Sequence, residues 1–125
     1  LFLKVADLTS TDLKPTVEPH TPLKNVILEI TKNRLGVAVV INNNEIVGVI
    51  TDGDLRRLLL KHISLDTPIS EVMKNSPITL NGKQMAIEAL KIMEKQKITS
   101  FLITDTDNSL IGSLTLQSLF KAKIL

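Results

Sequence analysis

The segment GVITDGDLRR, residues 48–57, has the clearest local pattern in the chain. Its short β-branched run ends at Thr51, and an apolar helical pattern then follows at Leu55, Leu58 and Leu59. Thr51 with Asp54 three residues later resembles a capping box, in which side-chain oxygens accept from free amides at a helix start. The segment therefore predicts a strand ending at Thr51 and a helix over residues 52–60.

The pattern around this segment occurs twice. LIGSLT at residues 110–115 aligns with IVGVIT at residues 46–51, and the preceding apolar runs and polar turns align as well. The aligned pairs are residues 5–8 with 69–72, 15–17 with 78–80, 21–30 with 84–93, 35–41 with 98–104, and 52–60 with 116–123. Spacings of three and four predict helices, and short β-branched runs predict buried strands.

Each half therefore predicts the order strand, helix, strand, hairpin, strand, helix. The fold class is α/β (α+β), with two pseudo-symmetric β-α-β-β-α motifs at residues 1–66, including an N-terminal lead-in, and at residues 67–125. Residues 61–68 form the joint, because they contain turn-forming Ser, Asp and Pro residues. A half of about 60 residues is marginally stable alone. We therefore expect the two motifs to pack across one core as one domain.

Composition excludes several functional classes. Of 125 residues, 43% are hydrophobic and only 2% aromatic, so the core must be aliphatic. The absence of cysteine excludes disulfides and thiolate metal sites, and no apolar run approaches the roughly 20 residues of a membrane span. The net charge is +2 with scattered basic residues, which argues against nucleic-acid binding. His20 and His62 are far apart, so we expect neither a metal site nor a catalytic histidine.

The repeated unit, with its Gly-x-x-Thr-x-x-Asp signature at residues 48–54, resembles the CBS motif pair, or Bateman module. Residues 50–57 also resemble the first CBS motif of bacterial D-arabinose 5-phosphate isomerases, as do residues 3–8, 98–100 and 119–122. In that family an N-terminal sugar isomerase (SIS) domain interconverts ribulose 5-phosphate and arabinose 5-phosphate for Kdo, lipopolysaccharide or capsule synthesis. The resemblance implies that this chain is a fragment of such a cytoplasmic protein and carries no catalytic residue.

The resemblance also implies a ligand site. In CBS modules the aspartate equivalent to Asp54 holds ribose hydroxyls, and the threonine equivalent to Thr51 lies near the phosphate. The resemblance also implies contacts with the base of a nucleotide from Pro15 and Thr16 and from the backbone of Arg34 and Gly36. Arg56 and Arg57 are expected to contact a phosphate, and Gly53 leaves room beside the helix start. Three competing interpretations remain. Thr51 and Asp54 can serve as a helix cap, and the arginines can face solvent or a neighbouring subunit. The segments at residues 15–16 and 34–36 can be strand starts and nothing more, which is the favoured interpretation for them.

The second motif departs from this pattern. Thr115 is present, but Ser118 stands where the signature has aspartate, and Gln117 stands where the first motif has Gly53. A serine hydroxyl cannot present two acceptor oxygens to a vicinal diol as a carboxylate does. Thr115 and Ser118 therefore mark a second site that departs from the ligand-binding pattern, and we expect the first site to be the working one.

The resemblance implies that the function is regulatory sensing of a nucleotide or nucleotide-sugar, with AMP, ATP or CMP-Kdo as ligand and no required cofactor. The expected partners are the SIS domain of the same protein and further copies of the chain in a homo-oligomer. Two alternatives remain open at this point. The pair can be a structural oligomerisation module without a ligand, or it can belong to a different parent protein.

Overall fold

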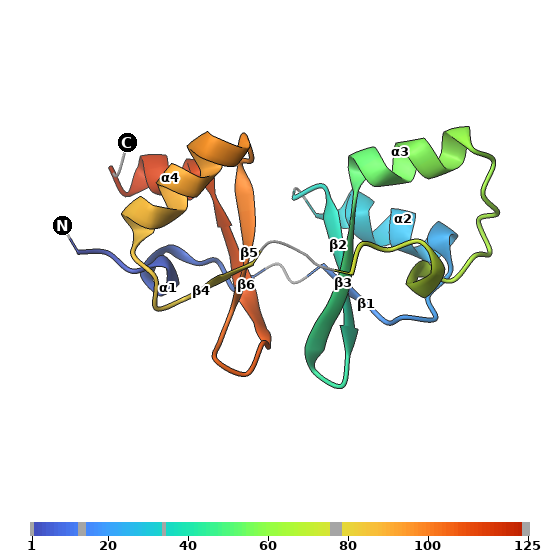
Figure 1. Ribbon diagram of the computed structural model, residues 1–125, viewed down its shortest axis with the longest axis horizontal. Coiled ribbons are helices and arrows are strands. Elements are labelled where there is room, and N and C mark those ends of the chain that lie inside the picture. The colour runs from blue at the N-terminus through green and yellow to red at the C-terminus, as the bar shows by residue number, and fades with distance from the viewer. Residues whose placement is uncertain (1, 13–14, 34, 76–78, 124–125) are drawn as a thin grey trace. The chain divides into compact units, whose positions relative to one another are not determined.

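The computed structural model describes residues 2–12, 15–33, 35–75 and 79–123, which form two compact units (Figure 1). The first unit is Pro15–Pro77, and the second combines Leu1–Lys14 with Ile78–Leu125. Each unit has a three-stranded sheet and the short strand, helix, hairpin and final helix predicted from the repeat. The mixed α/β fold class with two β-α-β-β-α motifs is confirmed.

The first unit has the strand order β1-β2-β3. Strand β1 pairs parallel with β2, and β2 pairs antiparallel with β3. Its elements are β1 (Thr16–Val17), α2 (Leu23–Lys32), β2 (Val37–Asn42), β3 (Glu45–Thr51), α3 (Asp52–Leu60) and the 3-10 helix η1 (Ile69–Glu71). Helix α2 makes the crossover that a parallel pair requires. Helix α3 begins at the residue after β3, as predicted from Thr51.

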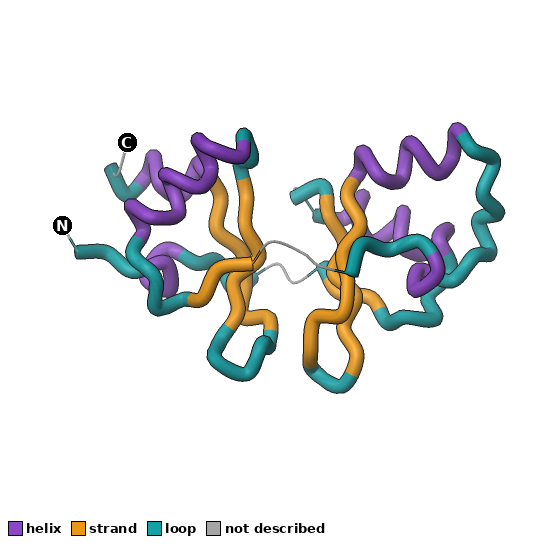
Figure 2. The backbone as a smooth tube through the Cα atoms, viewed as in Figure 1, coloured by secondary structure: helices purple, strands orange, loops and turns teal. Residues whose placement is uncertain are grey.

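The hairpin between β2 and β3 turns at Asn43 and Asn44, whose φ angles are 52° and 65°. A two-residue hairpin turn with positive φ at both positions matches the twist of the flanking strands, and asparagine tolerates this region. The predicted polar turn is therefore present, and Figure 2 shows it joining the two strands. The turn pairs Asn42 with Glu45, and a one-residue register shift between Val40 and Ile41 then places Val37 opposite Thr51.

The second unit repeats this topology with the strand order β4-β5-β6. Its elements are α1 (Val5–Leu8), β4 (Thr79–Asn81), α4 (Ala86–Gln96), β5 (Ser100–Thr104), β6 (Leu110–Thr115) and α5 (Leu116–Lys121). Strand β4 pairs parallel with β5, and β5 pairs antiparallel with β6. In each unit the two repeat helices lie on the same side of the sheet (Figure 1), so one sheet face carries the helix-covered core.

Each unit has a hydrophobic cluster of its own, and the expectation that the two motifs pack across one core as one domain stays a prediction. In the first unit the buried cluster is Leu23, Val26, Ile30, Ala38, Val40, Ile50, Leu55 and Ile69. In the second it is Val5, Leu80, Ala86, Ala89, Leu90, Met93, Phe101, Ile103, Leu114 and Leu119. The physical reason for the two clusters is that each sheet already has two helices and a lead-in segment to cover one face.

None of the helices in the described part of the chain is long and apolar enough to cross a membrane.

The lead-in segments explain why the compact units differ from the repeat boundaries at residues 1–66 and 67–125. Residues before the first motif pack on the second sheet: the amides of Val5 and Ala6 donate to the carbonyls of Gln84 and Gly82 at 2.7 and 2.8 Å. The lead-in of the second motif, which contains Ile69, stays with the first unit, where Ile69 is fully buried. The repeat boundaries stay a prediction about motifs, while hydrogen bonding and burial define the compact units.

Candidate functional site

The candidate site begins where β3 passes into α3. The amide of Asp54 donates to Thr51 Oγ1 at 3.2 Å, and the amide of Thr51 donates to Asp54 Oδ2 at 3.0 Å. These two reciprocal bonds form the capping box that the sequence pattern predicted. The helix start therefore holds the Asp54 carboxylate in one orientation.

Two cations share the other oxygen of this carboxylate. Arg57 Nη2 lies 2.6 Å from Asp54 Oδ1, and Lys74 Nζ lies 3.1 Å from the same atom. The Asp54 side chain is 10% exposed, whereas the Arg57 and Lys74 side chains are 64% and 65% exposed. The site is thus a nearly buried carboxylate whose two cationic partners keep most of their own surface in water.

The pKa of Asp54 follows from these contacts. Burial raises it, but hydrogen bonds from the Thr51 backbone and side chain, Lys74 and Arg57 outweigh burial and lower the pKa to about 2. The carboxylate is therefore ionised at neutral pH. Arg57 and Lys74 bring two positive charges to the negative charge of Asp54, and Asp52 adds a second carboxylate in the same first turn of α3.

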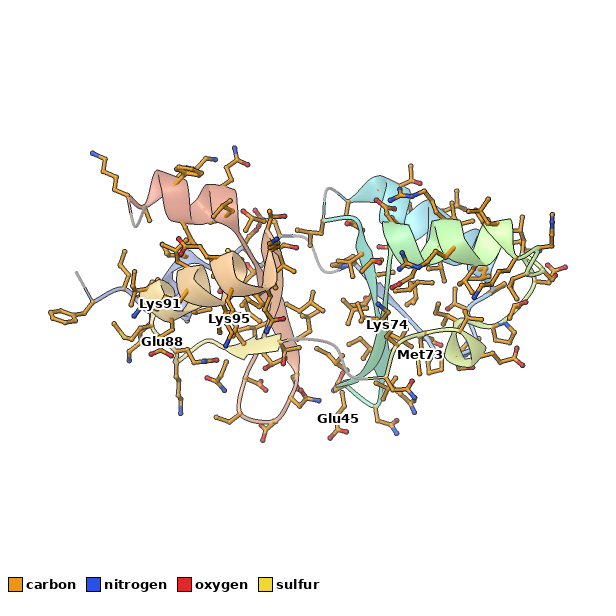
Figure 3. The ribbon with its side chains drawn as sticks, turned by 45° about the horizontal axis from the view of Figure 1, so that its top comes forward. Glu45, Met73, Lys74, Glu88, Lys91 and Lys95 are labelled. Atoms are coloured by element: carbon orange, nitrogen blue, oxygen red, sulfur yellow. The ribbon has the colours of Figure 1, made fainter. Side chains whose placement is uncertain are left out.

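Lys74 is a residue that sequence reasoning missed. It lies after η1 in the lead-in to the second motif, and its amide and carbonyl exchange hydrogen bonds of 2.9 Å with Val49 of β3. Figure 3 shows Met73 and Lys74 beside the strands of the first unit. The available signal was the alignment of residues 69–72 with 5–8, but that alignment does not reveal which sheet a lead-in joins.

Gly36 and Gly53 flank the same helix start in different ways. Gly36 has a φ of +66°, and its carbonyl accepts from the Asp52 amide at 2.9 Å. A Cβ at Gly36 would come 3.0 Å from Asp52 Oδ2, so both backbone conformation and space favour glycine there. A Cβ at Gly53 would meet nothing closer than Arg57 Nη1 at 3.5 Å. A Cβ at Gly53 would thus make ordinary van der Waals contacts, and the role of Gly53 beside a ligand stays a prediction.

The remaining first-site residues are spread over the unit. The Pro15 carbonyl accepts from the Val39 amide at 2.7 Å, and Thr16 pairs with Val39 and is exposed. Because β2 lies between β1 and β3, Thr16 and Thr51 are on strands that do not pair. Arg56 is exposed on α3. Arg34 lies outside the described residues.

The corresponding position of the second unit is uncharged. Thr115 caps α5 by accepting from the Ser118 amide at 3.2 Å, and the Thr115 and Ser118 hydroxyls are 3.0 Å apart. The Leu116 amide donates to the Thr99 carbonyl at 2.8 Å, which repeats the bond from Asp52 to Gly36. The backbone frame of the site is therefore repeated, but Ser118 supplies a hydroxyl where Asp54 supplies a carboxylate.

Comparison with known proteins identifies both halves of the chain. A family model described as CBS domain matches residues 5–61 and again residues 69–124. Arabinose 5-phosphate isomerase KdsD of Francisella tularensis is 36% identical over 126 residues, which cover 99% of this chain and 38% of that protein. Arabinose 5-phosphate isomerase GutQ of Salmonella typhi is 37% identical, covering 91% of this chain and 36% of that protein. The chain thus spans little more than a third of these relatives.

Solved structures share the fold at lower identity. A putative acetoin utilization protein (AcuB) from Vibrio cholerae superposes with a TM-score of 0.84 at 19% identity, covering 99% of this chain and 92% of that chain. A CBS domain protein from Pyrobaculum aerophilum, described as complexed with AMP, superposes with a TM-score of 0.81 at 24% identity. The match covers 94% of this chain and 90% of that one.

Proposed function

Because the chain belongs to the CBS domain family, we propose that it is the regulatory, ligand-binding CBS pair of an arabinose 5-phosphate isomerase. The identity of 36–37% to KdsD of Francisella tularensis and GutQ of Salmonella typhi supports this parent. The isomerase chemistry then belongs to a SIS catalytic domain of the same cytoplasmic protein, and this chain supplies no catalytic residue. Its role is to shift that enzyme between states that bind the ligand unequally.

The proposed ligand is a nucleotide or nucleotide-sugar, with AMP, ATP and CMP-Kdo as the candidates. The observation that carries the proposal is the ionised Asp54 carboxylate at the start of α3, next to the exposed cations Arg57 and Lys74. A carboxylate accepts from vicinal ribose hydroxyls, and cations pair with phosphate. The Pyrobaculum aerophilum protein described as complexed with AMP supports the ligand class.

Thermal unfolding with AMP, ADP, ATP, CMP and CMP-Kdo tests this proposal. A ligand at about 100 times its Kd adds about 2.7 kcal/mol, which moves the midpoint by several degrees. The matched variant is Asp54→Ser, because the second motif has serine at this position and Thr115 still caps its helix by accepting from the Ser118 amide. Loss of the shift in Asp54→Ser supports the proposal, and no shift with any of these compounds in the wild type would refute it.

A second candidate function is assembly without a ligand. Both Asp54 oxygens already have partners within the unit, so the carboxylate has a sufficient structural role as cap and ion-pair acceptor. Exposed apolar side chains on the helices, namely Leu28, Leu60 and Phe120, suit contacts between copies. Sedimentation of the protein with and without nucleotide separates the functions: a tight homo-oligomer that ignores every nucleotide favours assembly.

A further inference from the structure

Lys74 is held in place more firmly than an exposed lysine usually is. Its backbone forms an antiparallel bridge with Val49, with N···O distances of 2.9 Å in both directions. Its Nζ reaches Asp54 Oδ1 at 3.1 Å from outside the helix that carries Asp54. The bridge fixes the backbone from which the Lys74 side chain extends toward Asp54.

The second unit offers an internal comparison. There Ser10 bridges Ser113 as Lys74 bridges Val49, with N···O distances of 2.9 and 3.0 Å. The backbone position is thus equivalent, but Ser10 is uncharged, and so is Ser118 at the position of Asp54. Within one chain the carboxylate and the lead-in lysine are present together in one unit and replaced together in the other. This joint presence indicates that the Lys74 side chain acts at the Asp54 site and is not needed to stabilise the sheet.

The acceptor positions of Asp54 limit how a diol can bind. A carboxylate has about four lone-pair positions, two on each oxygen. Oδ1 accepts from Arg57 and Lys74, while Oδ2 accepts from the Thr51 amide. A vicinal diol that bridges both oxygens therefore needs one donor to leave Oδ1. Lys74, at 3.1 Å, is the more easily displaced, because Arg57 is closer, at 2.6 Å, and lies three residues away on the same helix.

We propose that Lys74 is the specificity-determining residue of this site, which competes with a ligand diol for Asp54 and pairs with an anionic group of the ligand once displaced. The proposal rests on the proposed function, since it assumes a ribose-type diol at Asp54. A neutral nucleoside breaks the ion pair between Lys74 and Asp54 and offers the lysine no new anionic partner. A nucleotide breaks the same ion pair, but its phosphate then pairs with the freed ammonium group. Lys74 thus selects for ligands that carry both groups.

Calorimetric titration of the protein with adenosine and AMP, and with cytidine and CMP, tests the proposal. In Lys74→Ala the nucleotide Kd should rise about tenfold, the loss expected for one charge-assisted hydrogen bond. The nucleoside Kd should stay equal or fall by up to about fivefold, because the largely exposed Lys74 no longer competes with the diol for Asp54. Lys74→Arg, which keeps the charge, should retain most of the preference for the nucleotide.

Lys24→Ala is the matched control, since Lys24 is an exposed lysine of the same unit paired with an aspartate, Asp66, at 2.8 Å. It should leave the ratio of nucleotide to nucleoside affinity unchanged. An equal change for nucleoside and nucleotide in Lys74→Ala, or no change in either, overturns the role of Lys74 while the ligand site stands. A wild-type protein that binds none of the four compounds overturns this proposal. The proposed function falls with it only if ADP, ATP and CMP-Kdo also leave the thermal unfolding of the protein unchanged.

Discussion

The side chain of Met73 lies directly over Gly48, where any larger residue would collide with it. A Cβ built on Gly48 would come 2.8 Å from Met73 Cγ and 2.9 Å from the Lys74 carbonyl oxygen. Close packing against Met73 and Lys74 therefore explains why the Gly-x-x-Thr signature has glycine at position 48. It lets the lead-in to the second motif run against β3, where Val49 and Lys74 form their bridge and where Lys74 reaches Asp54.

Gly48→Ala should lower the free energy of unfolding by about 1–3 kcal/mol, because overpacking forces side chains and backbone to shift. The Lys74 carbonyl is backbone, so rotation of Met73 alone cannot relieve the collision. Gly53→Ala is the matched control: its Cβ has ordinary space, and the change should be neutral or stabilising by up to about 1 kcal/mol. Urea unfolding measures both, and equal midpoints would contradict the packing argument.

Gly112→Ala should weaken the packing of the first-motif lead-in, at Thr9 and Ser10, against β6. A Cβ there would come 2.8 Å from Thr9 Cγ2 and 3.0 Å from the Ser10 carbonyl carbon. The affected hydrogen bonds are those that Ser10 exchanges with Ser113. Amide hydrogen exchange should therefore accelerate at Ser10 and Ser113, while the Val49 and Lys74 amides of the first unit keep their protection. Unchanged exchange at Ser10 would show that the lead-in does not depend on this glycine.

Periodicity was enough to predict the helices α2 and α4 and the faces that they bury. The apolar face predicted for the second-motif helix, Ala86, Ala89, Leu90 and Met93, is buried without exception. In the first motif Leu23, Val26 and Ile30 are buried and Ile27 packs against their cluster. These predictions succeed because a helix or strand that covers a sheet must repeat its apolar residues with the period of its own geometry.

Periodicity could not predict that the lead-in of each motif packs on the sheet of the other motif. The VADL segment at residues 5–8 aligns with residues 69–72, but nothing in it specifies which sheet it will cover. That choice depends on hydrogen bonds between distant segments, such as Val5 with Gln84. For the same reason the capping role of Thr51 and Asp54, a local pattern, was predictable, whereas the ion pair from Lys74 was not.

Thr51→Ala should cost about 1 kcal/mol of unfolding free energy, because it removes the acceptor for the Asp54 amide at the start of α3. Thr51→Ser keeps that oxygen and should lose much less. Thermal unfolding of the two variants gives the comparison. Thr115→Ala removes the equivalent cap of α5 and should behave like Thr51→Ala. If Thr51→Ser is as destabilised as Thr51→Ala, the hydroxyl is not the stabilising group.

Asn44→Gly should stabilise the first unit by up to about 1 kcal/mol, because Asn44 has a φ of 65° and glycine adopts that region freely. Asn42→Gly is the matched change in the last residue of β2, where extended backbone gives glycine no advantage and its flexibility costs stability. Chemical denaturation should therefore move the two midpoints in opposite directions. A shift of the same sign in both would argue against the turn geometry.

Acid should weaken the first unit through Asp54. Its pKa is about 2 in the folded protein against 3.8 for an ordinary aspartate, so the folded state holds its proton less tightly than the unfolded state. The corresponding stability is fully present above about pH 4 and is lost as the pH falls through about 2. The loss should amount to about 2 kcal/mol, measured as the change in unfolding free energy between pH 5 and pH 2. In Asp54→Asn this part of the pH dependence should vanish.

Asp66 provides the control for this acid effect, because salt acts differently on the two carboxylates. A hydrogen bond and the charge of Lys24 also lower the pKa of Asp66, but its side chain is 79% exposed. Salt near 1 M should remove the contribution of Asp66 and leave much of that of Asp54, since exposed pairs are screened more than buried ones. An acid transition that disappears in salt, or that survives unchanged in Asp54→Asn, would assign the effect to surface carboxylates rather than to the start of α3.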